Sequence, residues 1–142
     1  MVVSIIGVLS SIAFPTLHEV RDRAKVAKVA SDIKTFATSF AGYAAEMGQY
    51  PPDCEYSAPN HLPAGTGLES VIPVNAWVET TPLGGNYNWE GPDTYTYAGV
   101  AVADPTEPEL MELVDAALDD GDLAQGRFRQ TPNGRFTYIL EE

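Results

Sequence analysis

Cysteine is almost absent from this chain of 142 residues: Cys54 is the only one, so no intramolecular disulfide can form. A disulfide framework of the kind used by many small secreted folds is therefore excluded. Cys54 lies in the segment Pro51-Pro-Asp-Cys-Glu55, where acidic neighbours are expected to raise the pKa of the thiol. A nucleophilic role for this thiol is not expected.

Motifs that carry catalysis are also missing. The chain has no G-x-S-x-G nucleophile motif, no P-loop and no dinucleotide-binding fingerprint. The only two histidines, His18 and His61, are far apart in the sequence and belong to no metal-ligand pattern. We therefore predict that the protein is not an enzyme, has no catalytic residues and needs no cofactor, apart from the calcium ion considered below.

Basic residues are scarce in the larger, C-terminal part of the chain. Residues 51–142 carry three arginines and sixteen acidic residues, whereas residues 1–50 carry five basic and four acidic residues. The net charge of the whole chain is −12. A nucleic acid needs a basic patch facing its phosphates, so direct binding of nucleic acid is not expected.

A continuous apolar run opens the chain. Residues 1–15 hold no charged residue and end at Pro15. The run is shorter than the roughly 20 apolar residues of a membrane-spanning helix. It is not patterned as a secretory signal peptide, because the basic residues follow the apolar core instead of preceding it. An apolar helix end suits a subunit that packs its helices against sister subunits or sits in a membrane before assembly, and a buried core helix of a globular domain is the simpler alternative.

Residues 16–49 are predicted to continue this run as an amphipathic helix. Gly48 and the following Pro51-Pro52 predict its C-terminal end, and Pro15 predicts a kink where the two parts join. Polar residues such as Asp32 are expected on the outer side of the helix. Apolar residues at helical spacing predict the buried face: Ile33, Phe36, Ala37, Phe40, Ala44 and Met47.

The apolar run carries an ordered motif: Val2, Val3, Ile5, Ile6, Gly7, Leu9, Ile12, Ala13 and Pro15. With the basic amphipathic helix that follows, it resembles the N-terminal helix of the type IV pilin superfamily, which includes the type II secretion pseudopilins. The resemblance implies an α+β fold, in which a long kinked N-terminal helix packs on a small antiparallel β-sheet with one short inserted helix. It also implies that the prepilin-type segment is truncated at its start, ahead of Met1.

The same resemblance implies a structural subunit of a type IV pilus-like or type II secretion pseudopilus filament, which is a helical homo-oligomer assembled through this helix. It further implies an inner-membrane location before assembly and a periplasmic or cell-surface filament afterwards. Prepilin peptidase and the inner-membrane assembly machinery are the implied partners. The residues predicted to pack in the filament core are Val2, Val3, Ile5, Ile6, Gly7, Val8, Leu9, Ile12, Ala13, Phe14 and Pro15.

Four basic residues near the start of the amphipathic helix form a second predicted assembly element. Arg21, Arg23, Lys25 and Lys28 are expected to contact the acidic globular part of a neighbouring subunit. Opposite charges on facing surfaces would fix the register of such a contact.

The remainder of the chain divides into two predicted parts. Residues 50–75 are a connecting loop rich in proline and glycine, and residues 76–142 are a globular β-rich domain. Aromatic and β-branched residues predict strands at 86–89, 95–102, 127–129 and 135–140, and Pro132-Asn-Gly134 predicts a hairpin turn. Apolar residues at helical spacing predict the inserted helix at 108–118, capped by Thr106 or Asp104.

Two further patterns leave alternatives open. Asp119, Asp120 and Asp122 could supply oxygens to a calcium ion, although their spacing differs from an EF-hand loop and an acidic turn is the simpler interpretation. Five aromatic residues could form a binding platform, although strand aromatics more often pack in a core. They are Trp77, Trp89, Tyr87, Tyr95 and Tyr97.

Two alternatives to the filament subunit also remain. One is a minor or tip adhesin-like binding module, in which residues 53–75 and the aromatic face of the sheet contact a ligand. The other is a soluble periplasmic domain.

Overall fold

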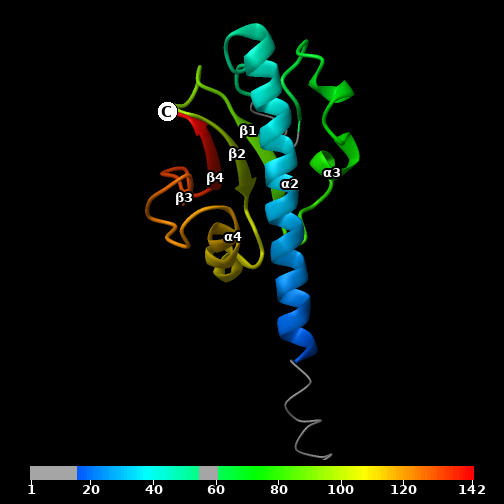
Figure 1. Ribbon diagram of the computed structural model, residues 1–142, viewed down its shortest axis with the longest axis vertical. Coiled ribbons are helices and arrows are strands. Elements are labelled where there is room, and N and C mark those ends of the chain that lie inside the picture. The colour runs from blue at the N-terminus through cyan, green and yellow to red at the C-terminus, as the bar shows by residue number, and fades with distance from the viewer. Residues whose placement is uncertain (1–15, 55–60) are drawn as a thin grey trace, which may run out of the picture.

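A computed structural model describes residues 16–54 and 61–142. The predicted filament-core residues 2–15 and the predicted kink at Pro15 lie outside the described residues. One long helix and a four-stranded sheet dominate the fold (Figure 1). The elements are α2 (Leu17–Met47), η1 (Leu68–Ser70), α3 (Val74–Val78), β1 (Asn86–Glu90), β2 (Ala98–Ala103), η2 (Pro108–Leu110), α4 (Met111–Leu118), β3 (Phe128–Gln130) and β4 (Phe136–Glu141).

The sheet is antiparallel throughout, with the strand order β1-β2-β4-β3. The predicted α+β class is confirmed, and a strand is present in each of the four predicted segments, whereas the order of the strands in the sheet was not predicted. Helix α2 lies across one face of the sheet, while η1 contacts α2 and α3 contacts β1 (Figure 1). Helix α4 packs against both α2 and β3.

The ends of α2 follow from local chemistry. The Thr16 hydroxyl accepts a hydrogen bond from the Glu19 N–H at 3.4 Å, as expected for a residue that caps a helix N-terminus. Gly48 adopts a left-handed conformation with φ of 79°, and its N–H donates to the Ala44 carbonyl at 2.8 Å. Only glycine enters this region without a steric cost, so the helix ends where the sequence predicts.

The buried face of α2 is shifted relative to the prediction. Ile33, Phe36, Ala37 and Phe40 are buried as expected, but Met47 is exposed. Asp32, predicted on the outer side, is instead buried. Its carboxylate accepts hydrogen bonds from the Tyr87 hydroxyl at 3.0 Å and from Lys28 Nζ at 2.7 Å, and these two partners make its burial tolerable.

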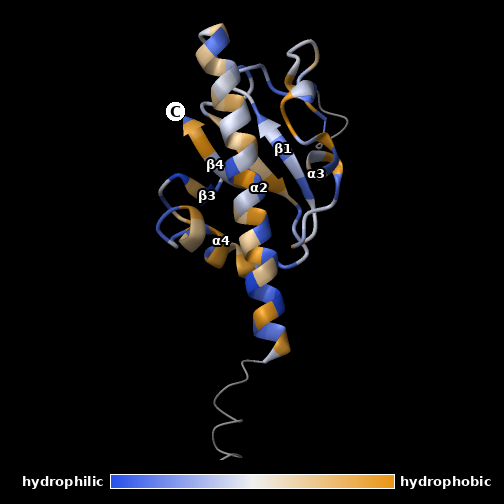
Figure 2. Ribbon diagram, turned by 45° about the vertical axis from the view of Figure 1, so that its right-hand side comes forward, coloured by the Kyte–Doolittle hydropathy of each residue, from blue (hydrophilic) through white to orange (hydrophobic). Residues whose placement is uncertain are grey.

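Aromatic rings fill the space between α2 and the sheet. Phe40 stacks on Trp89 with ring centroids 3.8 Å apart, and Phe36 meets Trp77 and Tyr87 edge-on, each at 4.9 Å. All five side chains are at most 1% exposed. In Figure 2, β2 and β4 carry mostly apolar residues where they lie behind α2. The core is therefore one continuous apolar layer between helix and sheet.

The inserted helix at 108–118 is confirmed as η2 followed by α4, but its predicted cap is wrong. No side-chain cap hydrogen bond is present at the start of η2 or of α4. The Thr106 hydroxyl instead donates to the Leu83 carbonyl at 3.2 Å. Asp104 adopts a positive φ of 50° in the turn before η2, away from the helix start.

The predicted inner-membrane location is contradicted. Among the helices in residues 16–54 and 61–142, none combines the length and the apolar character needed to cross a bilayer. The longest, α2, has charged residues in almost every turn of its first half, including Glu19, Arg21, Asp22 and Arg23. A charged side chain is costly at the centre of a bilayer, so this composition does not suit a membrane span.

Candidate functional site

The first part of α2 projects away from the rest of the molecule. No residue from Leu17 to Lys25 is buried, and the first buried side chain of the helix is Val26. Figure 1 shows this segment extending past α4 and the sheet. We call residues 17–25 the stalk. At 1.5 Å per residue, the stalk is about 13 Å long.

The stalk exposes apolar side chains as well as charges. Leu17 is 84% exposed and Val20 is 48% exposed, whereas most large apolar side chains of the described residues are buried. These two residues lie one turn apart on the same side of the helix. Exposed apolar side chains rimmed by charges make this side of the stalk a candidate for contact with another protein.

The four basic residues predicted to contact a neighbouring subunit have different surroundings. Lys25 pairs with Glu107 at 2.7 Å, and Lys28 pairs with Asp32 at 2.7 Å, so both are used within the chain. Arg21 and Arg23 are exposed and make no ion pair within the described part of the chain. Judged from residues 16–54 and 61–142, Arg21 and Arg23 are therefore the members of the predicted set that remain available to a partner.

The acidic residues of the predicted calcium site are only partly brought together. Asp115, Asp119 and Asp120 each place a carboxylate oxygen within 4.8 Å of the other two. Asp122 does not belong to this group, and its side chain accepts from the Ala124 N–H at 3.0 Å. The sequence analysis missed Asp115, which lies inside α4 and carries no motif of its own.

Asp115 is unusual among these carboxylates because it is fully buried. Neither of its side-chain oxygens makes a hydrogen bond of normal geometry within the described residues. Burial, with a smaller contribution from the charges of Asp120 and Asp119, raises the pKa of this carboxyl to about 6, although the Gly121 and Asp120 N–H groups oppose the shift. A buried carboxylate without a partner is costly, so this position favours a proton or a cation.

The turn after α4 holds Asp119 and Asp120 in place through its backbone. The Asp119 carboxylate accepts from the Arg127 N–H, and the Asp120 carboxylate accepts from the Asp122 N–H at 2.9 Å. Gly126 has φ of 84°, and a Cβ there would lie 2.1 Å from the Asp119 carboxylate. Glycine is therefore required for the chain to pass so close to this carboxylate.

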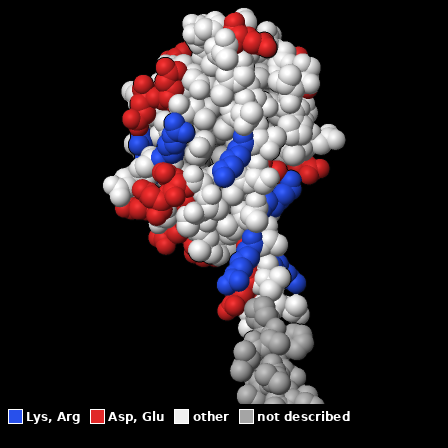
Figure 3. All heavy atoms as spheres, in the orientation of Figure 1, with Lys and Arg blue, Asp and Glu red and all other residues white. Residues whose placement is uncertain are grey.

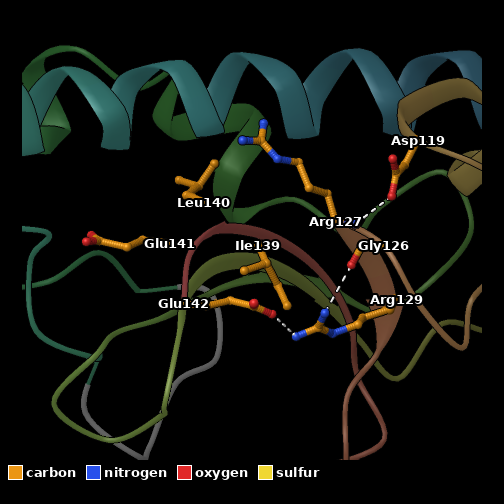
Figure 4. A pocket seen from close by; sticks show the side chains of 8 residues that line it. All are labelled: Asp119, Gly126, Arg127, Arg129, Ile139, Leu140, Glu141 and Glu142. Carbon is orange, nitrogen blue, oxygen red and sulfur yellow. Dashed lines mark hydrogen bonds and ion pairs between the residues drawn. The ribbon is translucent and has the colours of Figure 1, made fainter.

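An open hollow lies next to this turn, between the β3 and β4 strands and α2 (Figure 4). Arg129 extends across it to Glu142 and to the Gly126 carbonyl, and Arg127 extends toward α2. Basic and acidic side chains alternate around the hollow. Because Arg129 is already paired within the chain, the hollow does not present a uniform charge to a ligand.

A second polar cluster, not anticipated from the sequence, surrounds Glu90 on the face of the sheet opposite α2. Its carboxylate is fully buried and accepts four side-chain hydrogen bonds. The donors are Asn133 Nδ2 at 2.6 Å, Thr137 Oγ1 at 2.8 Å, Tyr97 Oη at 3.0 Å and Arg135 at 3.1 Å. Burial and the Glu90 charge raise the pKa of Tyr97 to about 12.

The Glu90 side chain can extend past β2 to β4 because Gly99 has no side chain. Glu90 pairs with Gly99 on β2, yet it contacts Thr137 on β4, one strand further along the sheet. A Cβ on Gly99 would lie 2.7 Å from Thr137 Cγ2, so a side chain there would occupy this path. All four partners belong to the chain itself and the carboxylate is closed to solvent. The cluster therefore acts as a structural clamp joining β1 to the β3–β4 hairpin.

The remaining candidate residues lie mostly inside the protein. Trp77, Trp89 and Tyr87 belong to the aromatic core, which leaves no exposed platform made by these three. Cys54 is buried, and its thiol donates to the His61 carbonyl at 2.8 Å. Burial raises the pKa of this thiol to about 12, and Asp53 adds to the shift. The predicted direction is confirmed, with burial as the larger cause.

No family model, curated protein or solved structure matches the chain. What the protein does must therefore be inferred from its own residues and geometry.

Proposed function

We propose that this chain is the structural subunit of a helical filament, of the type IV pilus-like or type II secretion pseudopilus kind. The N-terminal segment resembles that superfamily in its ordered apolar motif. A long helix laid on a small antiparallel sheet is consistent with the layout that the resemblance implies. The role is mechanical: the helices of successive subunits pack together and the β-rich heads form the outer surface.

The observation that carries this proposal is the stalk. A free monomer keeps Leu17 largely and Val20 about half in water, and burying the exposed part of these side chains would stabilise an assembly, by up to about 1.5–3 kcal/mol for Leu17 and less for Val20. The stalk and the head are different surfaces of the same molecule. A contact between the stalk of one copy and the head of the next is heterologous, so repeating it generates an open helical filament when the rotation between copies does not close into a ring.

Site-specific photo-cross-linking of the full chain tests the proposal. A photoreactive residue in place of Val20 is expected to yield a ladder of covalent dimers, trimers and larger species, because each stalk contacts a different copy. The same residue in place of Glu69, an exposed position in η1 remote from the stalk, serves as the matched control and is expected to give far less product. A single dimer band from position 20 would contradict the filament proposal. So would a yield of cross-linked product from position 20 that is no higher than the yield from the control at position 69.

We also propose that Asp115, Asp119 and Asp120 hold a calcium ion. Support comes from the buried, unpartnered Asp115 carboxylate, which is close to two carboxylates fixed by the turn. Calcium takes six to eight oxygen ligands, so backbone carbonyls and water would supply the rest. A bound ion would neutralise the charge at Asp115 and fasten the end of α4 to the turn that leads into β3.

Calcium is expected to raise the Tm of the wild-type protein by several degrees, because only the folded state brings the three carboxylates together. The Asp115→Asn variant is expected to be more stable than wild type in chelator, since it removes a buried unpaired charge, and to lose the response to calcium. Thermal unfolding in calcium, in magnesium and in chelator measures both effects. Asp122→Asn is the control, because Asp122 lies outside the group and its asparagine retains an acceptor oxygen. A calcium response that survives in Asp115→Asn would refute the site.

A further inference from the structure

The charged residues are unevenly distributed along the sequence. No lysine or arginine occurs between Lys34 and Arg127, while this interval contains most of the acidic residues. Figure 3 shows cationic side chains along α2 and its stalk, with acidic side chains beside them at the lower end of the helix. On the left of that view, on the side of the head where Figure 1 places α4 and β3, two groups of acidic side chains lie on either side of a smaller cationic group. The stalk and the α4 side of the head are different surfaces, and they differ in which charged residues have no ion pair among the described residues.

The basic surface is organised around the stalk. Leu17 and Val20 occupy one side of the helix, and Arg21 and Arg23 flank that side in opposite directions, as follows from 100° of rotation per residue. Neither arginine has an ion pair in the described ranges, unlike Lys25 and Lys28. We define the stalk patch as Leu17, Val20, Arg21 and Arg23.

The acidic surface is organised around η2 and α4. Glu109, Glu112 and Leu113 are all exposed, with Leu113 49% exposed, and neither glutamate has an ion pair in the part of the chain described. Their spacing of three and four residues places all three on one side of the helical segment. We define the α4 patch as Glu109, Glu112 and Leu113. Both patches thus combine an exposed apolar residue with charges, and the charges have opposite sign.

We propose that the stalk patch of one copy docks on the α4 patch of a second copy. Arg21 and Arg23 then face Glu109 and Glu112, and Leu113 packs against Leu17 and Val20. Opposite charges fix the orientation and exclude stalk–stalk and head–head pairing, where like charges would meet. The inference rests on the proposed function, because it names the surfaces through which filament subunits recognise each other.

A charge-swap experiment with the full chain tests this docking. The basic-to-acidic variant carries Arg21→Glu and Arg23→Glu, and the acidic-to-basic variant carries Glu109→Arg and Glu112→Arg. Each variant alone is expected to self-associate at least about tenfold more weakly than wild type, because its stalk and α4 patches have the same sign. Mixing the two is expected to restore association, since the acidic stalk of one matches the basic α4 patch of the other. Sedimentation velocity measures the weight-average size as a function of concentration.

Matched controls separate this effect from a change in total charge. Glu69→Arg with Glu79→Arg alters the charge as much as the acidic-to-basic variant, at two exposed positions outside α4, and is expected to associate like wild type. Circular dichroism checks that each variant is folded. Association in 0.5 M salt is expected to weaken for wild type and for the mixture, because salt screens exposed charges.

The outcomes separate the docking from the function. If wild type self-associates and the two patch variants do so equally well, the docking is wrong while the filament proposal stands. Loss of association in each variant without recovery in the mixture also overturns the docking. A wild-type chain that remains monomeric at every concentration, with no cross-linked ladder from position 20, overturns both.

Discussion

Replacement of Glu90 by alanine is expected to reduce the free energy of unfolding by about 4 kcal/mol. The substitution removes the acceptor for four hydrogen bonds at once, from Tyr97, Asn133, Arg135 and Thr137. It leaves the partly buried Arg135 without its counter-ion and opens a cavity at a fully buried position. A domain of this size is stabilised by only about 5–15 kcal/mol in total, so the loss is a large share.

Urea unfolding followed by tryptophan fluorescence measures this loss. Glu90→Gln is the informative second variant, because it preserves the shape of the side chain and one acceptor oxygen. Its amide NH2 group cannot accept a hydrogen bond, so either the Tyr97 and Thr137 hydroxyls or Arg135 would lose an acceptor. Its expected cost is smaller, at about 1–3 kcal/mol. Glu79→Ala, at an exposed position, is the control and is expected to change stability little. A cost below about 1 kcal/mol for Glu90→Ala would show that the clamp contributes little to stability.

Replacement of Phe40 by alanine is expected to cost about 3–5 kcal/mol of unfolding free energy. Phe40 is fully buried, stacks on Trp89 at 3.8 Å and lies 5.7 Å from the ring of Trp77. Its removal leaves a cavity in the layer that attaches α2 to the sheet. The aromatic pair contributes beyond the area that it buries, which places the effect toward the upper end of the range.

The same urea titration measures the Phe40→Ala variant, and the emission of Trp89 and Trp77 reports whether their surroundings change. Thr38→Ala, on the exposed side of the same helix, removes an exposed methyl group and a hydroxyl that donates to the Lys34 carbonyl. It is expected to be within about 0.5 kcal/mol of wild type. Similar midpoints for the two variants would mean that α2 is held to the sheet by contacts other than this ring.

Local signals predicted the elements of the fold well. Gly48 with Pro51-Pro52 marked the end of α2, because a left-handed glycine and two prolines each stop a helix for a reason contained in the residue itself. Pro132-Asn-Gly134 marked the turn between β3 and β4 in the same way. The prediction of the buried face of α2 is correct in the middle of the helix, which the sheet covers. It is wrong at Met47, where the side chain is exposed.

Long-range pairings were not predictable from single residues. Asp32 is buried because Tyr87, 55 positions away, donates to it, and no helix pattern contains that information. The buried cluster around Glu90 could not be predicted from the position of this residue in an aromatic strand. The cluster forms because Gly99, on the neighbouring strand, leaves room for the Glu90 side chain to reach β4. Strand order determines both contacts, and it is set by the packing of the whole chain.

The basic residues predicted to contact a neighbouring subunit also depend on long-range pairings that the sequence does not indicate. Net charge indicated that the basic helix would meet acidic surfaces, and Arg21, Arg23, Lys25 and Lys28 were predicted to act together. Two of them are used by Glu107 and Asp32 within the chain, which the spacing of basic residues along the helix does not indicate. Likewise, Asp115 became a candidate ligand only once its burial beside the acidic turn was known.

The buried Cys54 also gives the protein a built-in reporter of local opening. Thiol reagents attack the thiolate, and a thiol with a pKa of about 12 is almost entirely protonated near neutral pH. Reaction must therefore wait until Cys54 separates from the His61 carbonyl and reaches solvent. Since the chain has no second thiol, the labelling rate measures how often this one segment opens, and comparing free with assembled subunits would show whether assembly slows that motion.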